Sequence, residues 1–467
     1  MLRIFDRNVP LCDGVSRREW LRVGSLGLSG LSLPHLLASR DRAAEQGQGG
    51  AQPKAKSVIL FWLTGGVPQH DTWDPKPNGP DHSRSEFGAI PTRTPGLQVG
   101  ALMPQTAQLT DRIAVLRAMV TGDNSHSSSG YQMLTGVPHI PLSRENALPG
   151  APNDWPSLGA LTRVLRSDKD GLPSAITLPR HIANVGEKLW PGQDAGFLGR
   201  TVDPWLLTCD PSEEDFQIPD LQLPADVSEL RYDQRRGLLT QVNRQLDRFE
   251  QHAETEQYDR RTEQAISLLS GGRAREAFDL ARERDTIRDR YGRSKFAQSV
   301  LLARRLVEAG TSLVQVNWQR IDDKENNGSW DTHKDHHASL KGWLMPIMDQ
   351  AFSALLTDLE ERGLLDETLV AWVGEFGHTP RINARAGRDH WGSVFSIALA
   401  GGGVRGGVVH GESDREAAYP ISGRVAPNDY AATVLHCLGF EPETIIRDLQ
   451  DRPIPISRGK VIDQVLA

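Results

Sequence analysis

Short apolar runs, each followed by a polar or glycine-rich turn, constrain the fold of this chain more than any other feature. Residues 57–63 (SVILFWL) end in Thr64-Gly65-Gly66, a pattern typical of a buried β-strand. The same pattern predicts strands at 113–120, 174–178, 312–318, 368–373 and 394–400.

Helical patterns lie between these runs. We expect a helix to begin near 130–134, an amphipathic helix at 340–362 that Gly363 ends, and a closing helix at 427–439. Strands that alternate with helices predict an α/β fold, with three α/β/α layers and a mostly parallel central sheet. A charged segment with helical periodicity predicts a helical insertion at about 225–310.

The N-terminal segment is typical of an export signal. Arg17-Arg18 precede a mild apolar stretch at 23–38, which predicts a twin-arginine signal; a basic amphipathic helix of the mature fold is the alternative. We therefore expect 1–50 to be signal and linker and 51–467 to be the functional domain. The predicted location is periplasmic or extracellular, with the twin-arginine translocase as a partner. No later run of 18 apolar residues predicts a membrane span.

The charge balance argues against nucleic acid as a partner. Lys and Arg total 53 against 60 Asp and Glu, which gives a formal net charge of −7. Proteins that bind duplexes usually carry a basic excess.

Four polar clusters follow predicted strands, and ligands gather at the carboxyl ends of parallel strands. The first cluster contains Asp71 and Asp74, which are hard oxygen ligands for a metal or parts of an Asp-Pro turn. The second cluster, 123–130, contains His126 and Ser127 at a helix start, where an anion or a plain serine cap fits.

The other two clusters are rich in histidine. The third, 330–337, holds Asp331, His333 and His337, which suit zinc or another transition metal, with a solvated polar loop as the alternative. The fourth contains Glu375 at a strand end and Asp389-His390 in the segment that turns back toward it. It is the most specific local signal of the four.

Several motifs together resemble a known family. They are GGVPQHDTWDPKP (65–77), SSSGYQMLTG (127–136), WDTH (330–333), LEERGLLDETLVAWVGEFGHTPRIN (359–383), GRDHW (387–391) and AGGGVRGG (400–407). They resemble the exported bacterial domain-of-unknown-function 1501 family, which is similar to the alkaline phosphatase and sulfatase superfamily. The resemblance covers about 57–450 and implies an alkaline-phosphatase-like fold.

The resemblance also implies a metal-dependent hydrolase of phosphate or sulfate esters. Divalent zinc, calcium, magnesium or manganese ions would be held by residues that match the superfamily ligands. These candidate ligands are Asp71, Asp331, His333 (or His337), Glu375, His378, Asp389 and His390.

The nucleophile is the main departure from the superfamily pattern. Counting back nine residues from Thr135 gives His126, where those enzymes have Ser, Thr or Cys. Three interpretations stay open: Ser127 attacks after a one-residue shift, His126 attacks or binds metal, or the nucleophile is lost. The last interpretation favours a non-catalytic metal- or ligand-binding envelope protein.

The expected substrate is an anionic ester, either a small molecule or a polysaccharide. Several tryptophans are candidates for stacking on sugar rings, with core packing as the alternative. They are Trp73, Trp190, Trp330 and Trp391.

Overall fold

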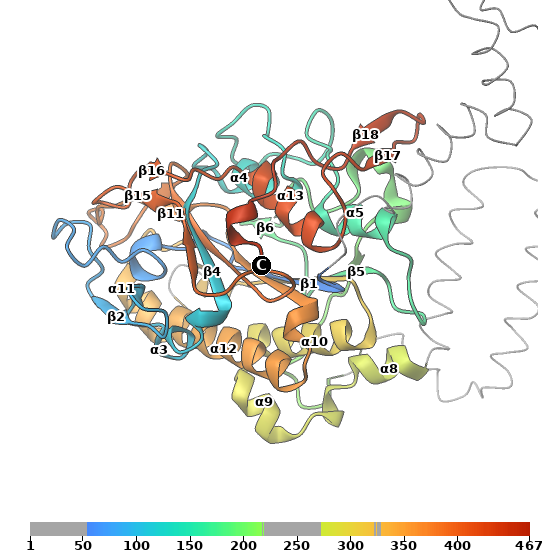
Figure 1. Ribbon diagram of the computed structural model, residues 1–467, viewed down its shortest axis with the longest axis horizontal. Helices are drawn as coiled ribbons and strands as arrows, with labels where there is room; N and C mark the ends of the chain where they lie inside the picture. Colours follow the sequence, from blue (N-terminus) through green and yellow to red (C-terminus); the bar gives the residue numbers. More distant parts are fainter. Residues whose placement is uncertain (1–53, 217, 219–271, 322–323, 325–327) are drawn as a thin grey trace, which may run out of the picture. The chain divides into compact units, whose positions relative to one another are not determined.

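One eight-stranded sheet organises the computed structural model, which describes residues 54–216, 218, 272–321, 324 and 328–467 (Figure 1). The strand order is β14-β4-β13-β10-β1-β9-β5-β8. All six strands predicted from the apolar runs lie in this sheet. The strands are β1 (Ser57–Trp62), β4 (Ile113–Met119), β5 (Ala175–Leu178), β8 (Trp205–Leu206), β9 (Leu313–Asn317), β10 (Thr368–Val373), β13 (Phe395–Ala400) and β14 (Val408–His410).

The sheet is parallel except at β13. Strand β1 pairs in parallel with β10 and β9, β5 pairs in parallel with β9 and β8, and β14 pairs in parallel with β4. Strand β13 is antiparallel to both of its neighbours, β10 and β4. The beginning of β13 therefore lies at the sheet edge where the other strands end.

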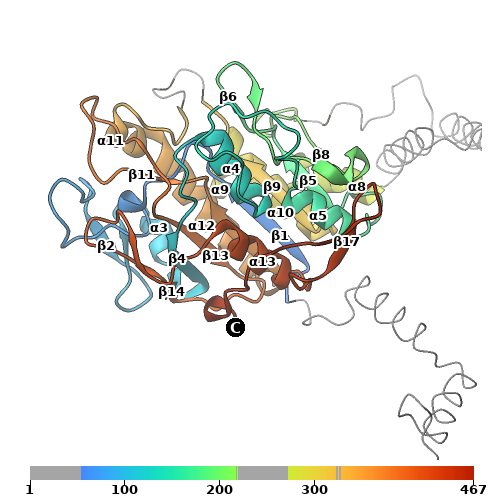
Figure 2. The same cartoon turned by 90° about the horizontal axis from the view of Figure 1, so that it is seen from above.

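Helices cover both faces of the sheet, so the predicted α/β/α class is confirmed (Figures 1 and 2). Strand β1 shows the cause, because it is apolar on both sides: Ile59 and Phe61 enter one core, and Leu60 and Trp62 enter the other. The first face carries α3 (Pro104–Ala107), α8 (Gly272–Phe278), α9 (Asp285–Tyr291), α10 (Lys295–Ala309) and α12 (Met345–Glu361). The second face carries α4 (His126–Thr135), α5 (Leu158–Leu165) and α13 (Pro427–Cys437).

Helix boundaries differ from the sequence-based expectation at three places. Helix α4 begins at His126, before the expected start near 130, because polar serines fill its first turn. The helix expected at 340–362 consists of a π-helical turn, Leu340–Leu344, followed by α12. Helix α13 ends at Cys437.

Part of the predicted insertion belongs to the fold itself. Helix α10 packs directly on β1 and β9, so it belongs to the helical layer that covers the first face of the sheet. Most of the remaining insertion, and the whole of the predicted export signal at 1–50, lie outside the described residues. No helix in the described part of the chain is long and apolar enough to span a bilayer.

Short strand pairs complete the structure at the sheet margins. The pair β11 (Gly377–His378) and β12 (His390–Trp391) lies between β10 and β13 in the chain and holds the fourth polar cluster. The other pairs are β2 (Ala89–Pro91) with β3 (Gln98–Gly100), β6 (Ala183–Asn184) with β7 (Lys188–Leu189), β15 (Glu412–Ser413) with β16 (Pro420–Ser422), and β17 (Ile445–Arg447) with β18 (Pro453–Pro455).

Candidate functional site

Four distant segments of the chain meet at the edge where β1, β9 and β10 end. His126 is the first residue of α4, which follows β4, and Asp331 lies in the loop after β9. Glu375 lies two residues beyond β10. His390 reaches the same place because it precedes β13, the reversed strand. The sheet topology therefore brings together four of the residues predicted as ligands or catalytic groups.

Asp331 is the centre of this group. Its Oδ1 lies 2.9 Å from His390 Nε2 and 3.0 Å from His333 Nε2, and its Oδ2 lies 3.2 Å from His126 Nε2. Three imidazoles from three different segments thus turn the same ring nitrogen toward one carboxylate. We name this set the Asp331 cluster: His126, Asp331, His333 and His390.

The opposite nitrogen of each ring contacts an oxygen atom. His390 Nδ1 lies 2.7 Å from the Asn124 carbonyl, His333 Nδ1 lies 2.8 Å from Asp389 Oδ1, and His126 Nδ1 lies 2.8 Å from Glu375 Oε1. A carbonyl or carboxylate accepts the Nδ1 proton, which leaves the Nε2 lone pair of a neutral ring facing Asp331. Histidines that bind metals are almost always oriented in this way.

The Asp331 cluster fits a cation. His333 Nε2 and His390 Nε2 are only 3.0 Å apart, and both face Asp331 Oδ1. Three electronegative atoms this close repel one another unless a proton or a cation lies between them. Ligand atoms of His126, Asp331 and His390 all lie within 4.8 Å of one another, and ligands around one zinc ion are roughly 3–4 Å apart.

Glu375 contacts the cluster through His126. It is fully buried, and its Oε1 accepts hydrogen bonds from the Gly65 amide and His126. Its Oε2 is buried and has no hydrogen-bond partner among the described residues, which is the kind of orphaned acceptor that an ion or a water satisfies. Ser129 of α4 donates to the Glu375 carbonyl over 2.6 Å and fixes the turn after β10.

The electrostatics of the metal-free cluster follow from these contacts. Burial lowers the pKa of His126, but hydrogen bonds to Asp331 and Glu375 outweigh burial and raise it to about 10. Burial raises the pKa of Asp331, but hydrogen bonds from His126, His333 and His390 hold it well below its ordinary value. The metal-free protein therefore pairs an ionised Asp331 carboxylate with a protonated His126, and a bound metal would take the place of that proton.

Aromatic rings limit the freedom of the imidazoles. The Trp190 ring stacks on His126 with centroids 5.7 Å apart, and the Phe376 ring stacks on His390 at 4.4 Å. Such packing positions ligands before they meet an ion.

Asp71 lies in a separate, fully buried group. Its Oδ2 accepts from His336 Nε2 over 2.9 Å, its Oδ1 accepts from Ser85 over 2.6 Å, and Arg388 Nε is 3.8 Å away. Burial raises the pKa of Asp71, but these donors keep it below its ordinary value. Ligand atoms of Asp71, His336 and His337 also lie within 4.8 Å of one another, so these three residues form a second candidate cation group, which shares no residue with the Asp331 cluster.

Other predicted site residues lie beside the cluster. His378 pairs with His390 across β11 and β12; burial lowers its pKa, and both its ring nitrogens lack a partner among the described residues. Ser127 is buried, and its Oγ accepts from Asn184 Nδ2 over 3.2 Å. Asp389 contacts Asn383 and the Nδ1 atom of His333, which is the ring nitrogen that faces away from Asp331.

Gly65 is a site residue that the sequence analysis treated only as part of a turn. Its φ is +119°, and its amide lies 2.8 Å from Glu375 Oε1. A Cβ at this position would lie 2.3 Å from the Asp331 amide. Only glycine lets the end of β1 pass so close to the loop that carries Asp331.

We expect Gly65→Ala to destabilise the fold and displace Asp331. Gly88→Ala is the matched control, because Gly88 also has a positive φ (+75°) but has open space around it. Gly88→Ala should lower the free energy of unfolding only by the backbone strain of alanine at a positive φ, which is about 1–2 kcal/mol. The free energy of unfolding in urea and the bound metal per chain would check this. Equal effects in both variants would show that the close approach is unimportant.

A three-layer α/β/α protein with imidazoles and carboxylates at the carboxyl edge of its sheet is the class that this fold and this site define. Within that class, the chain belongs to the family described as "Protein of unknown function (DUF1501)", which matches residues 55–466. The family identified from the sequence motifs is therefore confirmed.

Three solved structures are similar to this chain at low identity. Ps i-CgsB is 11% identical, with a TM-score of 0.38, over 83% of this chain and 72% of its own. The PsFucS1 sulfatase from Pseudoalteromonas sp. is 14% identical, with a TM-score of 0.38, over 92% and 74%. The phosphonate monoester hydrolase SpPMH from Silicibacter pomeroyi is 13% identical, with a TM-score of 0.34, over 87% and 76%. No curated protein sequence matches the chain.

Proposed function

We propose that this protein is a metal-dependent hydrolase of phosphate or sulfate esters. The observation that carries the proposal is the convergence of three imidazole Nε2 atoms on Asp331, each with its Nδ1 held by an oxygen. In this proposal the Asp331 cluster binds the metal, and Glu375 and Asp389 orient His126 and His333. Asp71 and His378 then support the site from a neighbouring buried layer.

The donor set favours zinc among the divalent ions considered. Three nitrogen atoms and one carboxylate suit zinc, whereas calcium and magnesium prefer oxygen ligands. A bound zinc ion would act as a Lewis acid toward the ester oxygen and toward water. The chain itself orients the ligands through Glu375, Asp389 and the Asn124 carbonyl.

Water is the nucleophile that the residue placement supports best. His126, which occupies the superfamily nucleophile position, is engaged by Asp331 and Glu375 on its two nitrogens. Ser127, one residue later, is only 1% exposed. A hydroxyl buried to this degree is poorly placed to attack an ester.

The same observation supports a second candidate, a non-catalytic metal- or ligand-binding protein. Such a protein would keep the cluster and hydrolyse nothing. For either function we infer export through the twin-arginine route, from Arg17-Arg18 and the apolar stretch after them.

Metal analysis and ester turnover on one preparation test the proposal. We expect bound zinc in the purified protein, hydrolysis of 4-nitrophenyl phosphate or 4-nitrophenyl sulfate, and loss of turnover after chelation that added zinc restores. Bound metal without turnover of either ester would favour the second candidate. Protein that binds no divalent metal at all would contradict both.

A further inference from the structure

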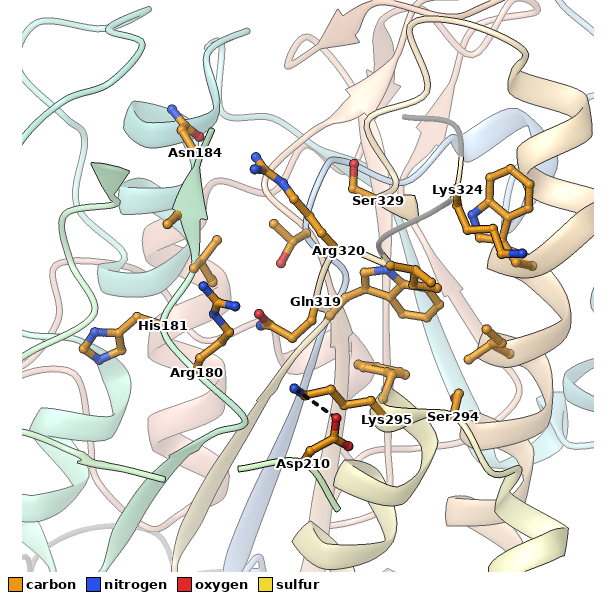
Figure 3. Close-up of a pocket in the computed structure, with 18 of the residues that line it drawn as sticks. Arg180, His181, Asn184, Asp210, Ser294, Lys295, Gln319, Arg320, Lys324 and Ser329 are labelled. Atoms are coloured by element: carbon orange, nitrogen blue, oxygen red, sulfur yellow. Dashed lines mark ion pairs between the residues drawn. The ribbon is translucent and has the colours of Figure 1, made fainter. Parts of the chain in front are cut away.

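A cavity of about 590 Å³ opens among Arg180, Asn184, Gln319 and Ser329 (Figure 3). It lies where β1, β5 and β9 end, and its wall includes the first turn of α10. This volume lies within the range of small-ligand sites and exceeds that of a single phosphate or sulfate group.

The described lining of the cavity carries more positive than negative side chains, although the chain as a whole is negative. Its described lining contains four cationic side chains, Arg180, Lys295, Arg320 and Lys324, against two carboxylates, Glu187 and Asp210. The chain as a whole carries a formal charge of −7. Clustered cations against this background concentrate anions locally.

The cations are available to a ligand. Arg320 is exposed and has no ion-pair partner among the described residues. Arg180 pairs with Glu187 at 3.1 Å, but both side chains are largely exposed, so the pair is weak and an incoming anion competes with it. Lys295, the first residue of α10, lies 3.4 Å from Asp210 at the positive end of that helix.

The side chains face a common space. In Figure 3 the head group of Arg180 lies beside the side chain of Gln319, Lys295 is joined to Asp210 by their ion pair, and Arg320 extends toward Asn184. Arginine binds carboxylate and sulfate-type oxygens through two parallel hydrogen bonds. The arrangement therefore suits an anionic group with several oxygens.

Three lining residues of this cavity adjoin the chain segments that carry His126 and Asp331. Asn184 lines the cavity and donates to Ser127, the residue after His126. Thr64 lines it too, and its carbonyl accepts from the amide of Trp330, next to Asp331. Ser329 lines it two residues before Asp331. The cavity and the Asp331 cluster therefore share the loop after β9 and the segment around Ser127.

One tryptophan of the lining, Trp343, offers a surface for a sugar ring. Trp343 lines the cavity, is partly exposed, and its indole N–H has no partner among the described residues. By contrast, Trp73, Trp190 and Trp330, which the sequence analysis considered for sugar stacking, are at most 2% exposed. Trp343 is therefore more exposed than those three, and the Lys324 ammonium lies 5.9 Å from the centre of its ring.

We propose that this cavity binds a second negative group of the substrate, and that the substrate class is an oligosaccharide carrying several anionic groups. This inference rests on the proposed function, because a substrate subsite in this cavity presupposes that the Asp331 cluster hydrolyses the same substrate. Arg180 and Arg320 hold the anionic group, and Trp343 packs against a sugar ring.

Calorimetric titration of the metal-loaded protein tests the anion subsite, with sulfated cellotetraose as the probe and unsulfated cellotetraose as the comparison. We expect Arg180→Gln/Arg320→Gln to weaken binding of the sulfated probe about tenfold or more. Arg93→Gln/Arg405→Gln removes the same charge from exposed positions away from the cavity and should change affinity less than about twofold. Equal binding of both sugars, equal loss in the two double variants, or no loss in either would overturn the proposal.

A second variant tests the sugar contact. Trp343→Ala should weaken binding of sulfated cellotetraose and leave the affinity for inorganic sulfate unchanged. Unchanged oligosaccharide binding would overturn this part of the proposal.

The outcomes separate the subsite from the hydrolase. If the protein hydrolyses neither aryl ester but Arg180→Gln/Arg320→Gln still weakens binding of the sulfated probe, the hydrolase proposal fails and the subsite stands. If the protein hydrolyses an aryl ester but binding does not depend on Arg180 and Arg320, the subsite fails alone.

Discussion

Asp331→Ala is expected to leave less than about a tenth of the bound metal and to lower ester turnover more than about 100-fold. Loss of an outer-shell partner alone typically costs 10- to 100-fold, and Asp331 contacts three imidazoles directly. Without its carboxylate, the three rings would repel one another when protonated. Elemental analysis after dialysis and initial rates with 4-nitrophenyl esters would measure both effects.

Two further variants sharpen this prediction. Asp335→Asn changes another aspartate of the same loop, whose side chain lies 3.7 Å from Lys334, and should leave metal content unchanged. Glu375→Gln keeps an oxygen that can accept from Gly65 and His126, so an orienting role predicts weaker metal binding without its loss. If Glu375→Gln removes the metal as completely as Asp331→Ala, Glu375 is itself a ligand. Full metal content in Asp331→Ala would contradict the proposed centre.

Arg304→Met is expected to lower the free energy of unfolding by about 2 kcal/mol or more, because it removes charged hydrogen bonds from two buried carboxylates, which keep only Arg305 and Arg362 as partners. Arg304 is fully buried in α10 and pairs with Glu283 at 2.7 Å and Asp358 at 2.9 Å. Tyr291 donates to Asp358 in the same network. Urea unfolding followed by circular dichroism would measure the loss.

The control for this prediction is Arg290→Met. Arg290 pairs with Glu361 at 2.6 Å on the surface of the same helical layer, and an exposed pair is worth less than about 1 kcal/mol. Similar losses in Arg304→Met and Arg290→Met would mean that burial of the ion pair does not matter. Metal content of the folded protein should be unchanged in both variants, because neither arginine contacts the Asp331 cluster.

The sheet was predictable because its strands are covered on both faces. Residues 57–63 are almost wholly apolar, since β1 lies between two helical layers, and the other strands show the same signal. The direction of β13 was not predictable. Its residues are as apolar as those of β10, and only the pairing with β4 and β10 makes it antiparallel.

The residues of the candidate site could be predicted from the sequence, but which of them contact one another could not. His126, Asp331, Glu375 and His390 stood out because they follow or precede apolar runs. Their partners could not be inferred, since His126 and Glu375 are 249 positions apart and meet only in the folded sheet. The partner of Asp71 was equally unpredictable. Asp71 follows β1, and the 3-10 turn Gln69–Asp71 places it beside His336, which is 265 positions away in the chain.

The reversed strand β13 makes the geometry of the site depend on distant parts of the chain. Strand β13 pairs with β10 on one side and with β4 on the other, and His390 lies just before it. His126, at the start of the helix after β4, and His390 are therefore placed through the same antiparallel pairing. A substitution that disturbs that pairing would displace two imidazoles of the Asp331 cluster at once.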